Sequence, residues 1–222
     1  MTTTSPLRIA VLASGRGSNL QALIEACSDG RLSARIVLVG SDRRQAQALQ
    51  RAESAGIEHF SLDPKAWPDR AGFDVALFRR VAESRPDLVV LAGYMRILDA
   101  AAVEAWQGRM INIHPSLLPR HRGLHTHRKA LEHGDADHGT SVHYVSAELD
   151  GGPVIAQAMT PIRSDDDETR LSERILQLEH QLLPAVVRLI ADGRLQWRQG
   201  MPWLDEQPLS TPLTWPFENA VA

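Results

Sequence analysis

The chain has 222 residues, of which 43% are hydrophobic and 23% are charged, as is typical of soluble globular proteins and not of disordered or fibrous ones. Its formal net charge of −3 argues against a protein whose main partner is a nucleic-acid backbone, because such binding needs clustered Lys and Arg residues. The lone cysteine, Cys27, excludes an intramolecular disulfide framework, and no apolar run reaches the roughly 18 residues that a membrane span needs.

The N-terminal half predicts alternating strands and helices. Its first residues, MTTTSP, lack the basic start and apolar middle of a signal peptide, so we expect a cytoplasmic protein. Short apolar runs, typical of buried strands, alternate with segments whose apolar residues recur at helical spacing. The expected strands are residues 7–13, 34–40, 57–62 and 87–93, and the expected helices are residues 20–30, 45–56 and 73–85. This order predicts an α/β protein with an open, mostly parallel, Rossmann-like sheet that has helices on both faces.

The C-terminal half predicts an antiparallel extension of that sheet. Its expected elements are, in order, a strand at 110–114, a helix at 127–134, strands at 139–145 and 152–162, and a long helix at 166–191. Pro184 should kink the long helix or start a new turn. The residues from about 203 to 222, rich in Pro and Trp, are expected to form an irregular tail on the surface. Because no linker or repeat divides the chain, we expect one domain, residues 1–222.

The glycine loop SGRGSN, residues 14–19, lies where the first strand meets its helix. Backbone N–H groups and the helix dipole converge there, which favours a bound phosphate, although a tight turn that needs glycine only for its geometry gives the same pattern. Dinucleotide binding is a third interpretation, because Asp42 after the second strand resembles a ribose-binding acid. The third glycine of that fingerprint is replaced by Leu20, so we favour a phosphate monoester over NAD.

Asn112 and His114 in MINIHP are two residues apart on an expected strand, so their side chains point to the same side. Pro115 favours an extended conformation at His114. An amide that stabilises an oxyanion beside an imidazole that acts as general acid or base suits acyl transfer. Ordinary capping or hydrogen bonding is the alternative for such a pair. Asp150, in a turn before two glycines, could bring a carboxylate against the imidazole and favour its charged form.

Histidines crowd the segment after this strand, which raises the question of a metal site. They are His121, His125, His127, His133, His138 and His143. With one cysteine and no HExxH or paired CxxC motif, we expect no metal. We expect His121, His133 and His138 to be solvated loop or helix residues. His127 and His143, in contrast, fall near the ends of elements close to the expected site.

Five strings resemble, in order and spacing, the folate-dependent phosphoribosylglycinamide formyltransferases: SGRGSNLQAL, LAGYMRIL, INIHPSLLP, GLHTHRKALEHGDADHGTSVHYV and ELDGGPVIAQ. The resemblance runs from about residue 7 to Leu195, and the later strings are more diagnostic than the glycine loop.

The resemblance implies the formyltransferase fold, with a phosphate-binding N-terminal half and a folate-binding, catalytic C-terminal half. The implied enzyme is monofunctional and belongs to de novo purine (IMP) biosynthesis. It transfers a formyl group from 10-formyltetrahydrofolate, its co-substrate, to the amino group of 5′-phosphoribosylglycinamide. The implied partners are these two small molecules, with no nucleic acid and no membrane, and the enzyme is a monomer or homodimer.

Carried over position by position, the resemblance assigns three groups of residues. The catalytic trio is Asn112, His114 and Asp150. The ribonucleotide-binding group is Gly17, Ser18, Asn19, Leu20 and Gln21, in the phosphate loop, with Glu179, which contacts the glycinamide. The folate-binding group is Met95, Arg96, Ile97 and Leu98, whose backbone meets the pterin edge, with Asn112 and with Arg70 from the loop 64–73. The departures from the family pattern are Arg16 in the glycine loop, Arg122 in place of a proline, and GSDRRQAQAL, residues 40–49.

The implied mechanism is direct attack of the glycinamide amine on the formyl carbon, with no covalent enzyme intermediate. Asn112 and protonated His114 would stabilise the negative charge that grows on the formyl oxygen. Asp150 would keep His114 protonated and order a water that moves the proton from the amine to the leaving nitrogen.

Three alternatives stay open beside this one. Methionyl-tRNA formyltransferase is similar around the catalytic Asn and His but carries an additional C-terminal nucleic-acid-binding domain. Formyltetrahydrofolate deformylase carries an additional N-terminal domain, and we expect neither extra domain in 222 residues. A non-catalytic nucleotide-binding module on the same sheet is disfavoured by the presence of the whole trio.

Overall fold

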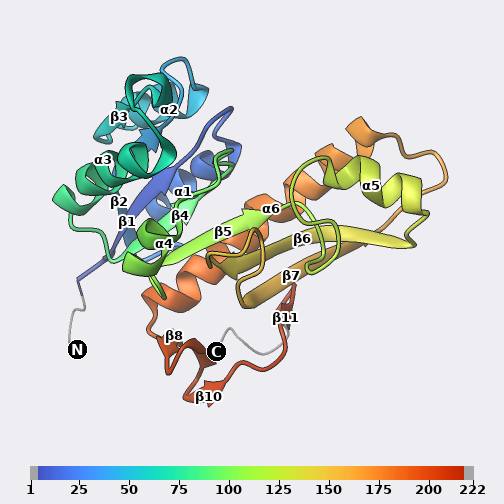
Figure 1. Ribbon diagram of the computed structural model, residues 1–222. Coiled ribbons are helices and arrows are strands. Elements are labelled where there is room, and N and C mark those ends of the chain that lie inside the picture. Colours follow the sequence, from blue (N-terminus) through green and yellow to red (C-terminus); the bar gives the residue numbers. More distant parts are fainter. Residues whose placement is uncertain (1–4, 218–222) are drawn as a thin grey trace.

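The computed structural model describes residues 5–217, which form one large sheet covered by helices and a small second sheet (Figure 1). The strands are β1 (Leu7–Leu12), β2 (Ala34–Ser41), β3 (His59–Ser61), β4 (Leu88–Leu91), β5 (Met110–His114), β6 (Asp137–Tyr144), β7 (Val154–Pro161), β8 (Leu195–Arg198), β9 (Met201–Leu204), β10 (Gln207–Pro208) and β11 (Leu213–Thr214). The helices are α1 (Ser18–Ser28), α2 (Gln47–Ser54), α3 (Arg70–Glu83), α4 (Ala100–Ala105), α5 (Thr126–His133) and α6 (Glu168–Ala191), with a 3₁₀ turn, η1 (Pro64–Ala66).

The large sheet has the strand order β11-β7-β6-β5-β4-β1-β2-β3. Neighbouring strands from β3 to β5 pair in parallel, whereas β6 runs antiparallel to β5, and β7 runs antiparallel to β6. The mostly parallel sheet with an antiparallel extension is therefore confirmed. All the parallel strands end at the same edge, which is where ligands bind in open α/β sheets.

Alternate residues of the buried strands explain the two helical layers. In β1, Ile9 and Val11 pack in the core that also contains the apolar residues of α1, α2 and α6. Their neighbours Ala10 and Leu12 lie in the other core, with residues of α3 and α4. A strand buried on both faces needs such a continuous apolar run, because its side chains alternate between the two faces.

The C-terminal segment differs from the expected irregular tail. Three short strands, β8, β9 and β10, form an antiparallel sheet of their own, and β11 adds to the edge of the large sheet where Leu213 pairs with Ala156. Strands of two to four residues carry too little periodicity to be seen in sequence, so only their pairing partners define them. The same holds for α4, which has six residues. Residues 218–222 lie outside the described part of the chain.

The long helix α6 runs through Pro184 as one helix, so no new helix starts there. Pro184 is itself buried, and α6 packs against β6 and β7. Tertiary packing therefore keeps the helix intact where local preference would break it. Within residues 5–217, no helix combines the length and the apolar character that crossing a membrane requires.

Candidate active site

The trio of Asn112, His114 and Asp150 comes together at the carboxyl end of β5, where all three line one cavity. His114 Nδ1 lies 3.5 Å from Asp150 Oδ2, and the two side chains are only 8% and 10% exposed. Asp150 reaches this position from the loop after β6, and Gly123 N donates a hydrogen bond of 2.9 Å to the same carboxylate oxygen. The carboxylate is thus held in place while it faces the imidazole.

The two glycines after Asp150 explain how that loop can return to the site. A Cβ on Gly152 would lie 1.9 Å from the carbonyl oxygen of Tyr144, so only glycine allows the backbone to fold this closely onto the end of β6. Asp150 itself has a positive φ of 47°. Such a conformation is one that Asp tolerates better than most residues. The sequence ELDGG therefore encodes a turn that delivers a carboxylate to β5.

His143 is a site residue that the sequence did not assign, and it fixes the Asn112 amide. The antiparallel register places it opposite Asn112, and His143 Nε2 lies 3.1 Å from Asn112 Nδ2. His143 Nδ1 donates to the carbonyl of Tyr144 at 2.9 Å, so its Nε2 is free to accept from the amide. Burial lowers the pKa of His143, which keeps the ring neutral and able to accept. The second N–H of the amide remains available to a ligand.

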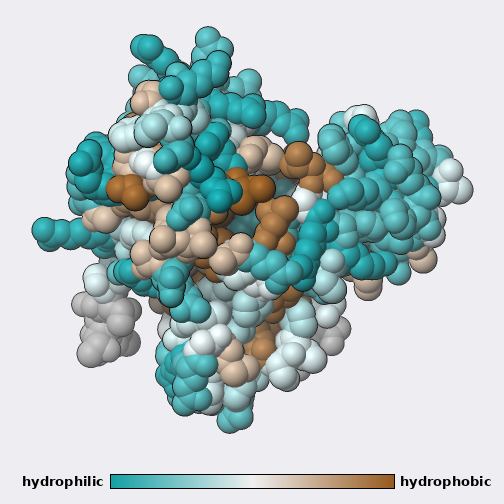
Figure 2. All heavy atoms as spheres, in the orientation of Figure 1, coloured by the Kyte–Doolittle hydropathy of each residue, from teal (hydrophilic) through white to brown (hydrophobic). Residues whose placement is uncertain are grey.

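The cavity, with a volume of about 480 Å³, is lined by polar side chains, the trio among them, and by apolar ones. The apolar wall consists of Met95, Ile97, Leu124 and Leu149, which are 49–65% exposed and make up four of the six large, exposed hydrophobic side chains of the described residues. Figure 2 shows apolar side chains gathered around a hollow near the centre of this face. A wall of this kind suits a flat aromatic ligand.

The glycine loop presents free backbone donors at the start of α1. Gly17, the residue that caps α1, has a left-handed φ of 69°, and no side chain caps the first turn. A Cβ on Gly17 would lie 2.7 Å from the Cα of Ala48, so the loop can pack this close to α2 only with glycine here. The uncapped N–H groups, at the positive end of the helix dipole, provide an anion site.

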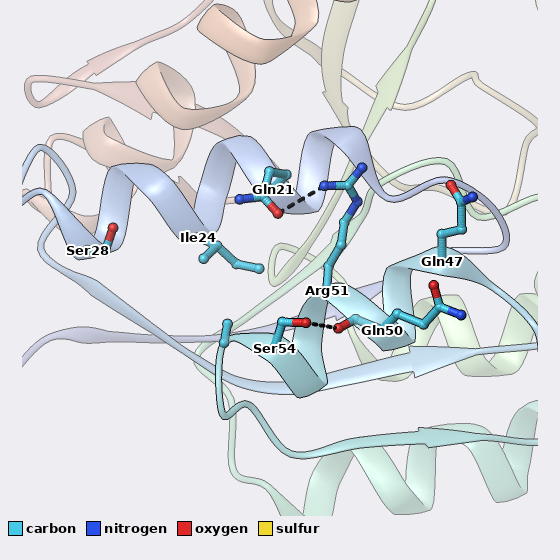
Figure 3. Close-up of a pocket in the computed structure, with 8 residues that line it drawn as sticks. Gln21, Ile24, Ser28, Gln47, Gln50, Arg51 and Ser54 are labelled. Atoms are coloured by element: carbon cyan, nitrogen blue, oxygen red, sulfur yellow. Dashed lines mark hydrogen bonds between the residues drawn. The ribbon is translucent and has the colours of Figure 1, made fainter.

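Arg51 of α2 clamps this loop from outside the cavity. Its Nε donates to the carbonyl of Arg16 at 2.8 Å, and its Nη1 donates to Gln21 Oε1 at 3.0 Å. Figure 3 shows the Gln21–Arg51 bond within a shallow pocket lined by α1 and α2. The side chain of Gln21 thus faces the groove between these helices, where it bonds Arg51, and does not line the trio's cavity.

Glu179 of α6 reaches the cavity beside the glycine loop. The Asn19 amide donates to Glu179 Oε2 at 2.6 Å, and both residues line the cavity. Burial raises the pKa of Glu179 to about 7, against the opposing effect of the Asn19 hydrogen bond. A carboxyl with this pKa can accept a hydrogen bond from an amine near neutral pH.

The remaining assigned residues are placed unevenly around the cavity. Met95, Arg96 and Ile97 line it, but Leu98 is buried in the core next to α3 and α4. Arg70 is exposed at the start of α3 and lies outside the lining. Gly17, Ser18, Leu20 and Gln21 also lie outside it, and Leu20 is fully buried, so it can offer a ligand only its backbone.

The histidine-rich segment is more buried than its sequence indicates. His138 is 1% exposed and the His121 side chain is 10% exposed, so the expectation that they are solvated is wrong; the His138 ring packs against the rings of His121 and His127. His127 lines the cavity, and its Nδ1 lies 3.1 Å from His138 Nε2. Among residues 5–217, no group of three or more His, Cys, Asp or Glu side chains is arranged to hold a metal ion.

Comparisons with known proteins agree with this geometry. The formyl transferase family model matches residues 7–187. Phosphoribosylglycinamide formyltransferase of Escherichia coli (strain K12) is 48% identical over 203 residues, which cover 91% of this chain and 96% of that protein. The trifunctional purine biosynthetic protein adenosine-3 of Drosophila pseudoobscura pseudoobscura is 46% identical over 85% of this chain, which spans 14% of that longer protein. The solved phosphoribosylglycinamide formyltransferase of Coxiella burnetii, in complex with CHES, has a TM-score of 0.91 at 43% identity and covers 95% of this chain and 100% of that one. The chain therefore belongs to the formyl transferase family and, within it, to the phosphoribosylglycinamide formyltransferases.

Proposed function

We propose that the chain moves a formyl group from 10-formyltetrahydrofolate to the amino group of 5′-phosphoribosylglycinamide by direct transfer, with Asn112, His114 and Asp150 as the catalytic trio. The observation that carries this proposal is the shared cavity. Its lining combines an amide, an imidazole and a carboxylate with apolar side chains and with Glu179 and Asn19, the last residue of the glycine loop. Acyl transfer between an aromatic donor and a phosphorylated acceptor needs these surfaces together.

The apolar wall fits the pterin ring of the folate. Met95 and Ile97 offer exposed apolar side chains, and Met95 N donates to Ser14 Oγ at 2.8 Å, which holds the segment against the glycine loop. Arg96 is partly stacked, with its guanidinium 4.7 Å from the centre of the Phe73 ring, and could meet a carboxylate of the folate tail. The bound folate supplies the electrophilic formyl carbon. Arg70, outside the lining, is the weaker of the two arginines for this role.

The ribonucleotide is placed from the opposite side. The free N–H groups at Gly17, Ser18 and Asn19 would hold its phosphate at the start of α1. Glu179 would then accept a hydrogen bond from the glycinamide amine and direct it towards β5. Because the pKa of Glu179 is about 7, its carboxyl is partly protonated at neutral pH and can release the amine easily.

The trio acts on the charge that develops on the formyl oxygen. Asn112 donates its free N–H, and His114 donates from Nδ1 when protonated, in a site whose side chains are mostly shielded from water. One preorganised donor of this kind is worth about 3–4 kcal/mol. Asp150 stabilises the imidazolium and orders the water that carries the proton from the amine to the leaving nitrogen.

We further propose that residues 1–222 act as a single domain, as a monomer or homodimer, without nucleic-acid or membrane partners. The large sheet draws strands from both ends of the described chain, because β11 joins the edge formed by β7. The lone Cys27 leaves no intramolecular disulfide, which is typical of the reducing cytoplasm, the compartment we propose.

The deciding experiment is a formyl-transfer assay on the full chain. The protein is mixed with 10-formyltetrahydrofolate and 5′-phosphoribosylglycinamide, and formylglycinamide ribonucleotide and tetrahydrofolate are measured. Parallel reactions contain aminoacylated tRNA, deacylated tRNA or no acceptor. We expect formyl transfer to the ribonucleotide alone. Transfer only to aminoacylated tRNA, or folate hydrolysis without acceptor, would instead assign the chain to one of the two related activities.

A further inference from the structure

The loop after β5 reaches back to the catalytic histidine through its backbone. His114 Nε2 lies 3.1 Å from the carbonyl oxygen of His121. A carbonyl oxygen can only accept, so Nε2 must carry a hydrogen whether the ring is neutral or charged. The proton that His114 gains or loses is therefore the one on Nδ1, the nitrogen that faces Asp150 at 3.5 Å.

The side chain of His121 holds that carbonyl in position. His121 has a left-handed φ of 54°, a conformation that L-residues rarely adopt because Cβ comes too close to the following carbonyl oxygen. Its Nε2 donates to Asp135 Oδ2 at 2.7 Å, and the two side chains are 10% and 17% exposed. Asp135 is anchored at the end of α5, where its N–H bonds the carbonyl of Ala130 at 3.1 Å. The strained turn is thereby tied to a rigid helix.

Other charged and titratable groups around His121 contribute less to this hold. Arg120 Nη1 reaches the same Asp135 oxygen only at 3.4 Å and is half exposed. The His133 and His138 rings meet His121 edge-on, with ring centres 5.3 and 6.2 Å away. Burial lowers the pKa of His138 to about 4, so that ring is neutral at pH 7. Within residues 5–217, the bond to Asp135 is the one directional bond of the His121 side chain.

We propose that His121 and Asp135 are positioning residues that fix the Nε2–H tautomer of His114 and thereby direct its mobile proton to the Nδ1 side, where Asp150 and the substrates meet. This inference rests on the proposed function for its catalytic consequence, but the tautomer itself is a property of the protein without substrate. In the other neutral tautomer the hydrogen is on Nδ1 and the Nε2 lone pair faces the carbonyl oxygen of His121, so Nδ1 cannot take up a proton on the side of Asp150. Holding a catalytic histidine in the wrong tautomer is a large loss in catalysis.

The first test measures the tautomer directly. Proteins labelled with ¹⁵N-histidine are compared by NMR without ligands, and the His114 signals are identified by their loss in His114→Gln. At a pH high enough for the ring to be neutral, we expect wild type to show a single tautomer with hydrogen on Nε2. His121→Phe, which keeps a ring of similar size, and Asp135→Ala should each give a mixture of tautomers. An unchanged single tautomer in both variants overturns the proposal, whatever happens to their melting temperatures.

The second test follows formyl transfer in the same proteins. We expect kcat to fall about tenfold in His121→Phe and Asp135→Ala, which is the smaller loss seen when a hydrogen-bond partner that orients a metal-bound histidine is removed. KM for both substrates should stay within about twofold of wild type. Asp135→Asn keeps an oxygen acceptor for His121 and should recover most of kcat. Arg120→Gln is the matched control, because it removes the longer contact to the same carboxylate, and it should behave as wild type.

The outcomes separate this proposal from the proposed function. Loss of kcat in Arg120→Gln equal to that in Asp135→Ala would mean that the loop is generally loosened, and would refute the tautomer role. A wild-type protein that shows the Nε2–H tautomer but transfers no formyl group would refute the proposed function and leave the tautomer assignment standing.

Discussion

The two strands that flank β5 are equally buried but differ in chemistry. All four residues of β4 are buried, and all are Leu or Val. Nearly all of β6 is buried as well, yet its buried residues include His138, Thr140, Ser141 and His143. A buried polar group is costly unless it is hydrogen-bonded, so β6 must gain something from these side chains that β4 does not need.

What β6 gains is control of β5, which carries Asn112 and His114, and of the loop after it. Thr140 Oγ1 donates to the carbonyl of His114 at 2.9 Å, and Ser141 Oγ donates to the carbonyl of Ser116 at 2.6 Å. His143 holds the Asn112 amide. The strand β4 therefore supports the fold by apolar burial, while β6 supports the site by hydrogen bonds. Variants on the three strands should separate activity from stability accordingly.

The largest effect is expected on β5 itself. His114→Ala and Asn112→Ala should each lower kcat by about 10²–10³-fold, because each removes an oxyanion donor. Thermal melting should stay within a few degrees of wild type. Steady-state kinetics with both substrates and a melting curve check this, and near-wild-type turnover in either variant would overturn the assigned mechanism.

On β4 the balance should be reversed. Leu88→Ala removes a side chain that is 2% exposed at the end of the strand remote from the site, and should cost about 2–5 kcal/mol of unfolding free energy. Urea unfolding measures this cost. The kcat of the folded fraction should be unchanged, and a selective loss of kcat without destabilisation would show that β4 also serves the site.

The free energy of unfolding should depend on pH through Glu179 of α6, the helix that packs on β6. Glu179 has its pKa raised by burial from 4.5 to about 7, so the folded state binds its proton more tightly than the unfolded state does. The stability that this protonation provides is complete below about pH 4.5 and is lost as the pH rises through about 7. Glu179→Gln keeps the oxygen that accepts from Asn19 but cannot ionise. Between pH 4.5 and 8, wild type should lose roughly 3 kcal/mol relative to this variant. Parallel curves of unfolding free energy against pH would contradict the assignment.

The smallest effect is expected from a single hydroxyl on β6. Ser141→Ala leaves the N–H of Leu118, which bonds Ser141 Oγ at 3.0 Å, without that acceptor. We expect a cost of about 1–3 kcal/mol in urea unfolding, with a modest fall in kcat because the loop after β5 is loosened. Ser41→Ala, a buried serine on β2 that accepts one bond from Arg43 N, is the control and should leave kcat unchanged. Equal kinetic effects in both variants would remove the distinction between β6 and the parallel strands.

Most of the helices and strands follow from local signals in the sequence. Continuous apolar runs such as LVVL predict buried parallel strands, and apolar residues at helical spacing predict the helices between them. The two-residue spacing of Asn112 and His114 places both on one strand face. The ELDGG string places Asp150 in a turn that can return to that strand. Spacing alone therefore makes Asn112 and His114 candidates, and the family resemblance assigns the whole trio, Glu179 and the segment from Met95 to Leu98.

The contacts that cross between strands and loops depend on the tertiary structure. His143 meets Asn112 because of the β5–β6 register, and His121 meets His114 through a backbone carbonyl whose position depends on Asp135. Neither can be read from spacing, because a shift of register by one residue would turn every side chain of β6 to the other face. The burial of His138 and the pairing of β11 have the same origin. Periodicity reports the face that a residue occupies, whereas the partner on that face is set by the packing of segments far apart in the chain.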